Sequence, residues 1–234
     1  MAINTLPLSA QNRAPNPNEV AVYEHINFVG KQRIWALEPG MRQKLVPFVG
    51  NDINDMISSI QVGAKVGVMF FVDANYRGKG NTTIQSINSL PPEYNDAISS
   101  LIIFPREWLT PLGVSLAGPS VGATPLGGFF PAPEKMSDPT ASYPYVGDDL
   151  NDKVQVAYVW PSSTQSPVSN QLEIKLCEHV NFGGKCITIP GPGSPVFKFE
   201  LSDYQFSGIT SSLQVTHFPV RSLEKRPARP LQKR

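Results

Sequence analysis

The chain has 234 residues, a length that suits one large domain or two small ones, and we expect two. Its 23 prolines, 18 glycines and charged fraction of 17% predict many turns and few long helices, which disfavours a helical bundle or a coiled coil. No stretch approaches the roughly 20 apolar residues of a membrane span, and the opening segment lacks the apolar core of a secretory signal. We therefore expect no membrane span, and a cytoplasmic or non-classically exported protein.

The net charge of +1 is unevenly distributed. Residues 221–234 contain six lysines and arginines against one glutamate, which leaves the rest of the chain net acidic. A basic end can contact nucleic acid or anionic lipid, but short basic ends broken by proline are more often solvated. We expect a disordered tail over 221–234 and no nucleic-acid partner. The two cysteines and three scattered histidines are too few for a disulfide framework or a zinc site.

Four segments precede that tail. Residues 1–18, rich in Asn, Pro and Ala, are typical of a disordered lead-in. Over 19–104, short β-rich runs alternate with Gly, Asn, Asp and Pro clusters at spacings that favour an all-β sandwich. Residues 105–140 contain seven prolines and five glycines, which predicts a linker or an irregular insertion. β-type patterning returns over 141–220.

A nine-residue segment occurs twice. YEHINFVGK at 23–31 recurs as CEHVNFGGK at 177–185, with six of nine positions identical. Two copies of one structural unit are therefore expected. His25 and His179 hold equivalent positions in the two copies, which indicates a role in a turn and not in catalysis.

A polar stretch that ends in two serines also recurs. It occurs as NDMISSIQV at 54–62 and NDAISSLII at 95–103, and in weakened form as SGITSSLQV at 207–215. A fourth segment, VGDDLNDKVQVAYV at 146–159, aligns without gaps on VGNDINDMISSIQV at 49–62. The four units therefore pair as two and two.

These motifs resemble those of the βγ-crystallins. Greek keys of that family carry an aromatic residue, six intervening residues and a glycine, followed by two Asn or Asp residues, two variable residues, a Ser or Thr and a final Ser. Tyr23 to Gly30 and Phe71 to Gly78 have the first spacing, and the first two polar stretches supply the second element. The resemblance implies an all-β fold, with a double Greek-key sandwich over 19–104, a Pro-rich connector and a second, diverged crystallin-like β domain.

The polar stretches suit a hard cation. Asp55 and Asp96 each lie in a short loop where a carboxylate, a hydroxyl three residues further on and backbone carbonyls can converge, and these are the oxygen ligands that Ca²⁺ prefers. The alternative is that both aspartates form Asx-turns while the serines bond the backbone. The doubled family pattern favours calcium as the cofactor.

In the family, the two polar stretches of a domain act as a double clamp in which each contributes to both calcium sites. By that resemblance, Asp55 would join Ser99 at one site, and Asp96 would join Ser58 at the other. The resemblance also implies backbone carbonyl ligands, from Glu24, Met56, Val72 and Ala97.

The second domain departs from the pattern. Cys177 replaces the hairpin aromatic, and no aromatic-to-glycine hairpin is visible upstream of the fourth stretch, so the domain is expected to be incomplete or rebuilt. The clamp logic pairs Asp152 with Ser211, both competent as ligands, and Gly208 with Gln155, neither of them competent. We expect at most one calcium site there. The competing interpretation is that the 146–159 stretch is an acidic turn and calcium binding is lost.

The two cysteines, Cys177 and Cys186, flank the second copy of the nine-residue segment. Strands that pair across a hairpin place opposed residues within reach of a disulfide. The absence of a signal segment favours two reduced thiols instead. Both states remain open at this stage.

No catalytic motif is visible: the sequence has no nucleophile elbow, no zinc-protease helix motif and no phosphate-binding loop. We therefore expect a non-enzymatic, calcium-binding structural protein that is stabilised by its ligand. The family resemblance links such a protein to stress, dormancy or development. Two alternatives remain, a calcium-dependent adhesion or ligand-recognition module that self-associates, and a secreted inhibitor or toxin-like protein.

Overall fold

The structure of the protein is a computed structural model. It describes residues 12–121, 124–135, 137–160, 171–190 and 197–218. Within these ranges the chain forms only β-strands and short 3-10 turns, and it contains no helix that is long and apolar enough to cross a membrane. The expected all-β class is confirmed. Most of the expected lead-in and all of the expected basic tail lie outside the described residues.

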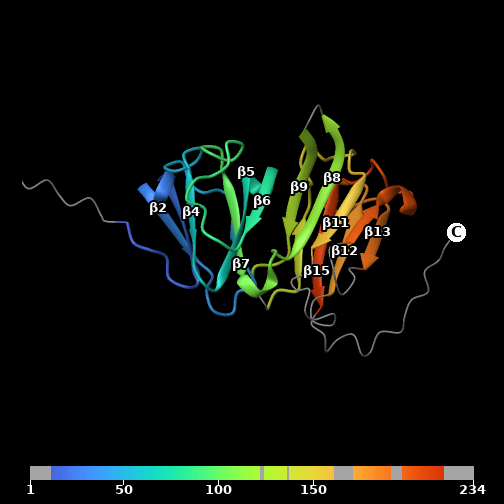
Figure 1. The fold of residues 1–234 in the computed structure, drawn as a ribbon. Helices are drawn as coiled ribbons and strands as arrows, with labels where there is room; N and C mark the ends of the chain where they lie inside the picture. The colour runs from blue at the N-terminus through green and yellow to red at the C-terminus, as the bar shows by residue number, and fades with distance from the viewer. Residues whose placement is uncertain (1–11, 122–123, 136, 161–170, 191–196, 219–234) are drawn as a thin grey trace, which may run out of the picture.

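The first domain is a pair of antiparallel sheets (Figure 1). Its strands are β1 (Glu19–His25), β2 (Val29–Ala36), β3 (Lys44–Val46), β4 (Ser59–Val62), β5 (Val66–Asp73), β6 (Arg77–Thr83) and β7 (Ser100–Pro105). The orders are β2-β1-β4 and β6-β5-β7-β3. Strand β3 belongs to the first repeat but pairs with β7 of the second, and a bridge between Ile60 and Ile87 returns the second repeat to the first sheet. This exchange is the expected double Greek key.

The second domain repeats this plan. Its strands are β8 (Gly113–Val121), β9 (Thr124–Pro131), β10 (Thr140–Tyr143), β11 (Val156–Trp160), β12 (Gln171–Cys177), β13 (Cys186–Pro190), β14 (Phe197–Glu200) and β15 (Ser212–Phe218). The orders are β9-β8-β11-β14 and β13-β12-β15-β10. Strands β10 and β14 cross between the two repeats as β3 does in the first domain. The domain is therefore a complete Greek-key pair, and the expectation of an incomplete domain is wrong.

The segment 105–140 is not the expected linker or insertion. Only a short connection, with the 3-10 turn η3 (Arg106–Trp108), separates β7 from β8, and the antiparallel pair of β8 and β9 forms about half of the segment. The second domain thus begins near Leu112 and not at residue 141. Pro119 lies in a register shift of this pair, and Pro131 ends β9, so neither interrupts a regular ladder. Composition alone cannot distinguish such a strand pair from a loop.

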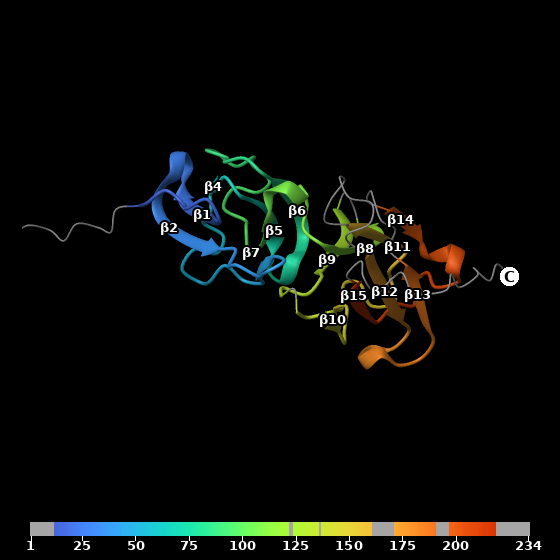
Figure 2. The same ribbon diagram turned by 90° about the horizontal axis from the view of Figure 1, so that it is seen from below.

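Each domain has its own apolar core, and a third cluster lies between them. Successive side chains of β5 point to opposite faces of its sheet and contribute to two of these clusters. Those that face the first core are Val66, Val68 and Phe70. Met69 and Phe71 face the other side of the sheet. The interdomain cluster comprises Met69, Phe71, Tyr76, Ile102, Phe104 and Phe129. The two domains lie next to each other in both views (Figures 1 and 2).

Polar side chains of the first domain complete the domain contact. Gln43 is fully buried; its Nε2 donates to the carbonyls of Leu112 (3.1 Å) and Ala132 (2.8 Å), and its Oε1 accepts from the Leu112 N–H (3.0 Å). Arg42 donates from Nη1 to the Pro133 carbonyl at 3.0 Å, and its Nη2 lies 3.2 Å from Nδ1 of His217 on β15. First-domain side chains therefore satisfy backbone groups that the second domain would otherwise bury unpaired.

This contact predicts a pH-dependent stability. Burial, with the Arg42 charge adding to it, lowers the pKa of His217 to about 4. The unfolded chain takes up a proton on this imidazole below about pH 6.5, whereas the folded protein does so only near pH 4, so stability is full above pH 6.5 and declines as the pH falls. We expect a loss of about 2 to 3 kcal/mol across this window.

Urea unfolding at a series of pH values measures this effect. His217→Gln should flatten the dependence between pH 6.5 and 4, while the exposed His25→Gln should keep that of the wild type. Identical slopes for His217→Gln and the wild type would show that the interface imidazole is not the cause.

Candidate metal centre

The structure brings together both aspartate–serine pairs expected in the first domain. Ser99 Oγ donates to Asp55 Oδ1 at 3.3 Å, and Ser58 Oγ donates to Asp96 Oδ1 at 3.0 Å. Both serines are 7% exposed, whereas both aspartates are exposed. Each pair therefore presents one carboxylate and one hydroxyl oxygen at the edge of the domain.

The backbone of each loop holds its aspartate in a fixed orientation. Asp55 and Asp96 have φ angles of 56° and 54°, in the left-handed region that Asp and Asn tolerate better than most residues. The preceding Asn54 and Asn95 each donate from Nδ2 to the second carboxylate oxygen at 2.7 Å. Each carboxylate is thus held between an amide and a hydroxyl.

The expected carbonyl ligands lie next to these pairs. The N–H of Ser58 donates to the Tyr23 carbonyl at 2.9 Å, and that of Ser99 donates to the Phe71 carbonyl at 3.0 Å. The next residues along the hairpins are Glu24 and Val72, so chain connectivity brings them to the first serine of each stretch. Met56 and Ala97 directly follow the two aspartates.

The second serine of each stretch has a structural role, because it holds a folded hairpin. Ser59 Oγ donates to the His25 carbonyl at 2.6 Å and accepts from the Phe28 N–H at 3.1 Å. Two further serines make the same pair of bonds, Ser100 with Asp73 and Tyr76, and Ser212 with His179 and Phe182. In the same hairpins the rings of His25 and His179 lie against Gly30 and Gly184, which agrees with the turn role expected for them.

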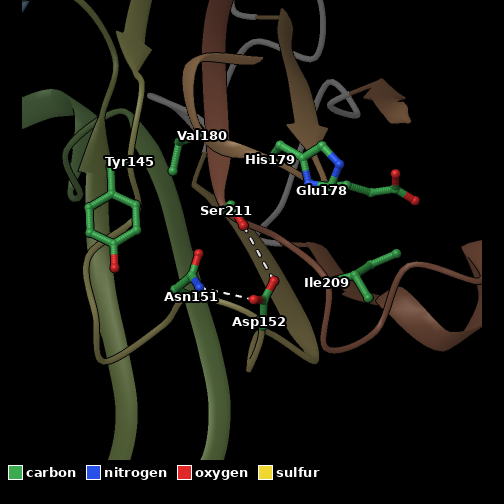
Figure 3. A pocket seen from close by; sticks show the side chains of 8 residues that line it. All are labelled: Tyr145, Asn151, Asp152, Glu178, His179, Val180, Ile209 and Ser211. Carbon is green, nitrogen blue, oxygen red and sulfur yellow. Dashed lines mark hydrogen bonds between the residues drawn. The ribbon is translucent and has the colours of Figure 1, made fainter. Parts of the chain in front are cut away.

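The second domain contains a third pair with the same geometry (Figure 3). Ser211 Oγ donates to Asp152 Oδ1 at 3.3 Å, and Asn151 Nδ2 donates to Asp152 Oδ2 at 2.9 Å. Asp152 has a φ of 55°, and the Ser211 N–H donates to the Cys177 carbonyl at 2.9 Å. The sequence-based pairing of Asp152 with Ser211 therefore matches the structure in its geometry.

The position opposite this pair lacks ligand groups. The Gly208 N–H donates to the Val154 carbonyl at 2.8 Å, as that of Asp96 donates to the Ile57 carbonyl at 3.0 Å in the first domain. Gly208 has a φ of 74° but no carboxylate. The loop thus keeps its shape without the acidic side chain.

An open pocket surrounds the third pair (Figure 3). It is lined by Tyr145, Asn151, Asp152, Glu178, His179, Val180, Ile209 and Ser211. Glu178 was not among the ligands expected from the sequence, although the nine-residue repeat aligns it with Glu24. Both glutamates accept a backbone N–H of their own hairpin, Glu24 from Lys31 at 3.0 Å and Glu178 from Lys185 at 2.8 Å. Glu178 would therefore contribute its backbone carbonyl to a metal, as expected for Glu24.

The chemistry of these pairs fits Ca²⁺. Among the described residues, no group of three or more His, Cys, Asp or Glu side chains could hold a metal ion. Each pair instead combines one carboxylate, one hydroxyl and adjacent carbonyls, a set of hard oxygen donors that leaves room for water. Magnesium requires a tighter octahedron and gives up its water reluctantly, so this set suits it less well.

A disulfide joins Cys177 to Cys186. Of the two states left open by the sequence, a disulfide or two reduced thiols, the structure has the disulfide. The two residues are directly opposite each other on β12 and β13. Cys177 stands where the first-domain hairpins carry Tyr23 and Phe71, so a covalent link replaces the aromatic residue beside the third pair.

Reduction of this bond should destabilise the second domain by about 2 to 3 kcal/mol, because a short closed loop removes a limited chain entropy from the unfolded state. Thermal unfolding with and without reductant measures the loss, and Cys177→Ser/Cys186→Ser should match the reduced protein. Mass spectrometry should show that the unreduced protein is lighter than the reduced protein by the mass of two hydrogen atoms. Two alkylatable thiols in the folded, unreduced protein would contradict the bond.

Comparisons with known proteins identify similar solved structures. No family model matches the chain, and no curated protein matches it. A structure from a study of the evolution of the eye lens βγ-crystallin domain fold shares 27% identity, and the match covers 41% of this chain and 94% of that one, with a TM-score of 0.36.

Two further structures come from microorganisms. The Ca²⁺-bound βγ-crystallin domain of Abundant Perithecial Protein from Neurospora crassa shares 20% identity, over 40% of this chain and 96% of its own, with a TM-score of 0.33. A βγ-crystallin from an archaeon shares 32% identity, over 37% of this chain and 96% of its own, with a TM-score of 0.30. On its strand order, its exchanged strands and its repeated motifs, this chain belongs to the βγ-crystallins.

Proposed function

We propose that this protein is a non-enzymatic structural protein that binds Ca²⁺ at three sites and is stabilised by it. Two sites lie in the first domain, at Asp55 with Ser99 and at Asp96 with Ser58. The third lies in the second domain, at Asp152 with Ser211. The observation that carries the proposal is the recurrence of one geometry, a left-handed aspartate beside a buried serine hydroxyl, in three loops.

The alternative that the aspartates only close turns is weakened by the fourth loop. There Gly208 makes the equivalent backbone hydrogen bond with no side chain. Left-handed backbone is also easier for glycine than for aspartate, so a turn alone would not require a carboxylate. Three exposed carboxylates held by neighbouring amides are better explained as cation ligands.

The energetic benefit of calcium is large relative to the stability of one domain. A domain of this size buries only some 60 to 70% of the surface of its unfolded chain, and its stability margin is small. Calcium at 100 times its dissociation constant adds about 2.7 kcal/mol per site. Occupied sites would therefore stabilise both domains against unfolding.

The disulfide supports an oxidising location. Such bonds persist in exported proteins and are rare in reducing compartments. We infer that the protein works outside the reducing cytoplasm. Of the two locations expected from the sequence, this favours non-classical export over the cytoplasm. Fractionation of the source cells, with alkylation of free thiols before lysis, tests this location.

Calorimetric titration of the full chain should detect three calcium ions, at micromolar to submillimolar affinity. Asp152→Ala should reduce the number to two, because it removes the only carboxylate of the third pair. Asn151→Ala is the matched control: it removes an orienting amide and should weaken the third site without abolishing it. No heat and no shift in melting temperature at millimolar calcium would refute the proposed function.

A gain of binding provides the converse test. A Cβ built on Gly208 would lie 3.6 Å from its nearest neighbour, an ordinary contact, and the φ of 74° resembles that of the three aspartates. Gly208→Asp combined with Gln155→Ser should therefore create a fourth site. Gly208→Asp alone, which lacks the hydroxyl, should bind more weakly. A folded double variant that still binds three ions would show that these two side chains are insufficient.

A further inference from the structure

In the first domain, an arginine of the same domain fastens the loop that carries Asp55. Arg33 on β2 donates from Nη1 to the Val49 carbonyl, and the same nitrogen lies 3.1 Å from the carboxylate of Asp52. Val49 begins the stretch that contains the aspartate. The guanidinium therefore sets the position of this loop against the sheet.

The second domain lacks this arginine. In the first domain Val22 pairs with both Arg33 and Ile60. In the second, Leu116 pairs with both Gly128 and Ala157, and Ala157 is the counterpart of Ile60 in the aligned stretches. Gly128 thus occupies the position of Arg33.

An arginine of the first domain fills the space above this glycine. Arg77 pairs with Gly128 in the bridge between β6 and β9, and a Cβ on Gly128 would lie only 2.2 Å from Nη1 of Arg77. The guanidinium packs over the Phe130 ring, 4.6 Å from its centroid. Any larger residue at 128 would therefore displace Arg77.

Arg77 makes one of the two contacts that Arg33 makes, the hydrogen bond to the first carbonyl of the loop. Its Nη2 donates to the carbonyl of Val146, the counterpart of Val49. Burial lowers the pKa of Arg77, and the negative charge of Asp149, the counterpart of Asp52, opposes that effect. The hydrogen bond of the missing arginine to this loop is thus supplied from the other domain, without a direct ion pair to the aspartate.

This contact leads directly to the third aspartate–serine pair. The N–H of Val146 donates to the Ser211 carbonyl at 2.9 Å, and Ser211 supplies the hydroxyl beside Asp152. Val146 is therefore held on one side by Arg77 and on the other by the residue that faces the carboxylate. Loss of the first contact would loosen the loop that carries Asp152.

We propose that Arg77 is a positioning residue that the first domain supplies to the calcium loop of the second domain. The calcium part of this inference rests on the proposed function. The third site is then complete only while the two domains are docked. Calcium at that site and docking of the domains stabilise each other, because coupling between two equilibria is reciprocal.

Arg77→Ala in the full chain tests the proposal. The Asp152-dependent calcium site should weaken about tenfold, since a hydrogen bond from a charged donor is lost, while the two first-domain sites keep their affinity. Arg33→Ala is the matched control, and it should weaken first-domain binding and leave the third site unchanged. An unchanged third site in a folded Arg77→Ala protein would overturn the proposal.

Hydrogen exchange separates this inference from the proposed function. In Arg77→Ala the amides of Val146 and Asp152 should exchange about tenfold faster without any calcium present, because their loop opens more often. If the wild type binds only two ions but this acceleration occurs, the third calcium site fails and the positioning role stands. Unchanged exchange refutes the positioning role.

A variant that exchanges the residues at positions 77 and 128 tests whether the effects of Arg77→Ala come from loss of the guanidinium or from general misfolding. Gly128→Arg alone should destabilise the domain contact, because the new side chain meets Arg77. Arg77→Gly combined with Gly128→Arg moves the guanidinium into the position that Arg33 has in the first domain. This double variant should restore slow exchange of the loop and, where the third site binds, its affinity. Failure to restore either, in a folded protein, would count against the proposed equivalence.

Discussion

The structure depends on the second serine of each polar stretch. Its hydroxyl donates to one carbonyl and accepts from one N–H of a folded hairpin; Ser59, for example, donates to His25 and accepts from Phe28. In these hairpins an Asn and the aromatic residue after it have left-handed backbone. A buried hydroxyl with both bonds made is fixed in orientation, and the strand that begins there is fixed with it. The first serine, one residue earlier, is thereby directed to the edge of the domain, where it meets the aspartate of the partner stretch.

The same constraint explains what sequence reasoning could and could not predict. Three repeats keep the second serine together with the folded hairpin. The pairing of their first serines with Asp55, Asp96 and Asp152 was predictable through the resemblance to the βγ-crystallins. In the remaining repeat Val156 stands at the serine position. No aromatic-to-glycine spacing marks its strands β8 and β9, and their prolines and glycines are typical of loops. The first two strands of the third repeat were therefore not recognised from the sequence, although its polar stretch at 146–159 was.

The domain contact could not be predicted from the sequence either, because its residues follow no repeat. Gln43 and Arg42 lie outside the motifs, and their partners are backbone carbonyls, which sequence cannot restrict. Met69 and Phe71 alternate with core residues on β5 and read as part of an ordinary buried strand. The structure shows, through the pairing of β6 with β9 and the packing of Phe129, that the second domain covers this face of the sheet.

The loop of the second domain is held by Arg77 of the first domain and not by an arginine of its own, whereas Arg33 holds the equivalent loop within the first domain. In the first domain the loop, its arginine and its aspartate all belong to one domain, so the proposed calcium binding there would need no neighbour. In the second domain Gly128 takes the place of that arginine, and the same glycine gives the space in which Arg77 and the neighbouring strand approach. On our proposal, divergence of the second domain thus couples ligand binding to domain docking through one guanidinium. A duplicated fold acquires in this way an interdomain dependence that neither copy has alone.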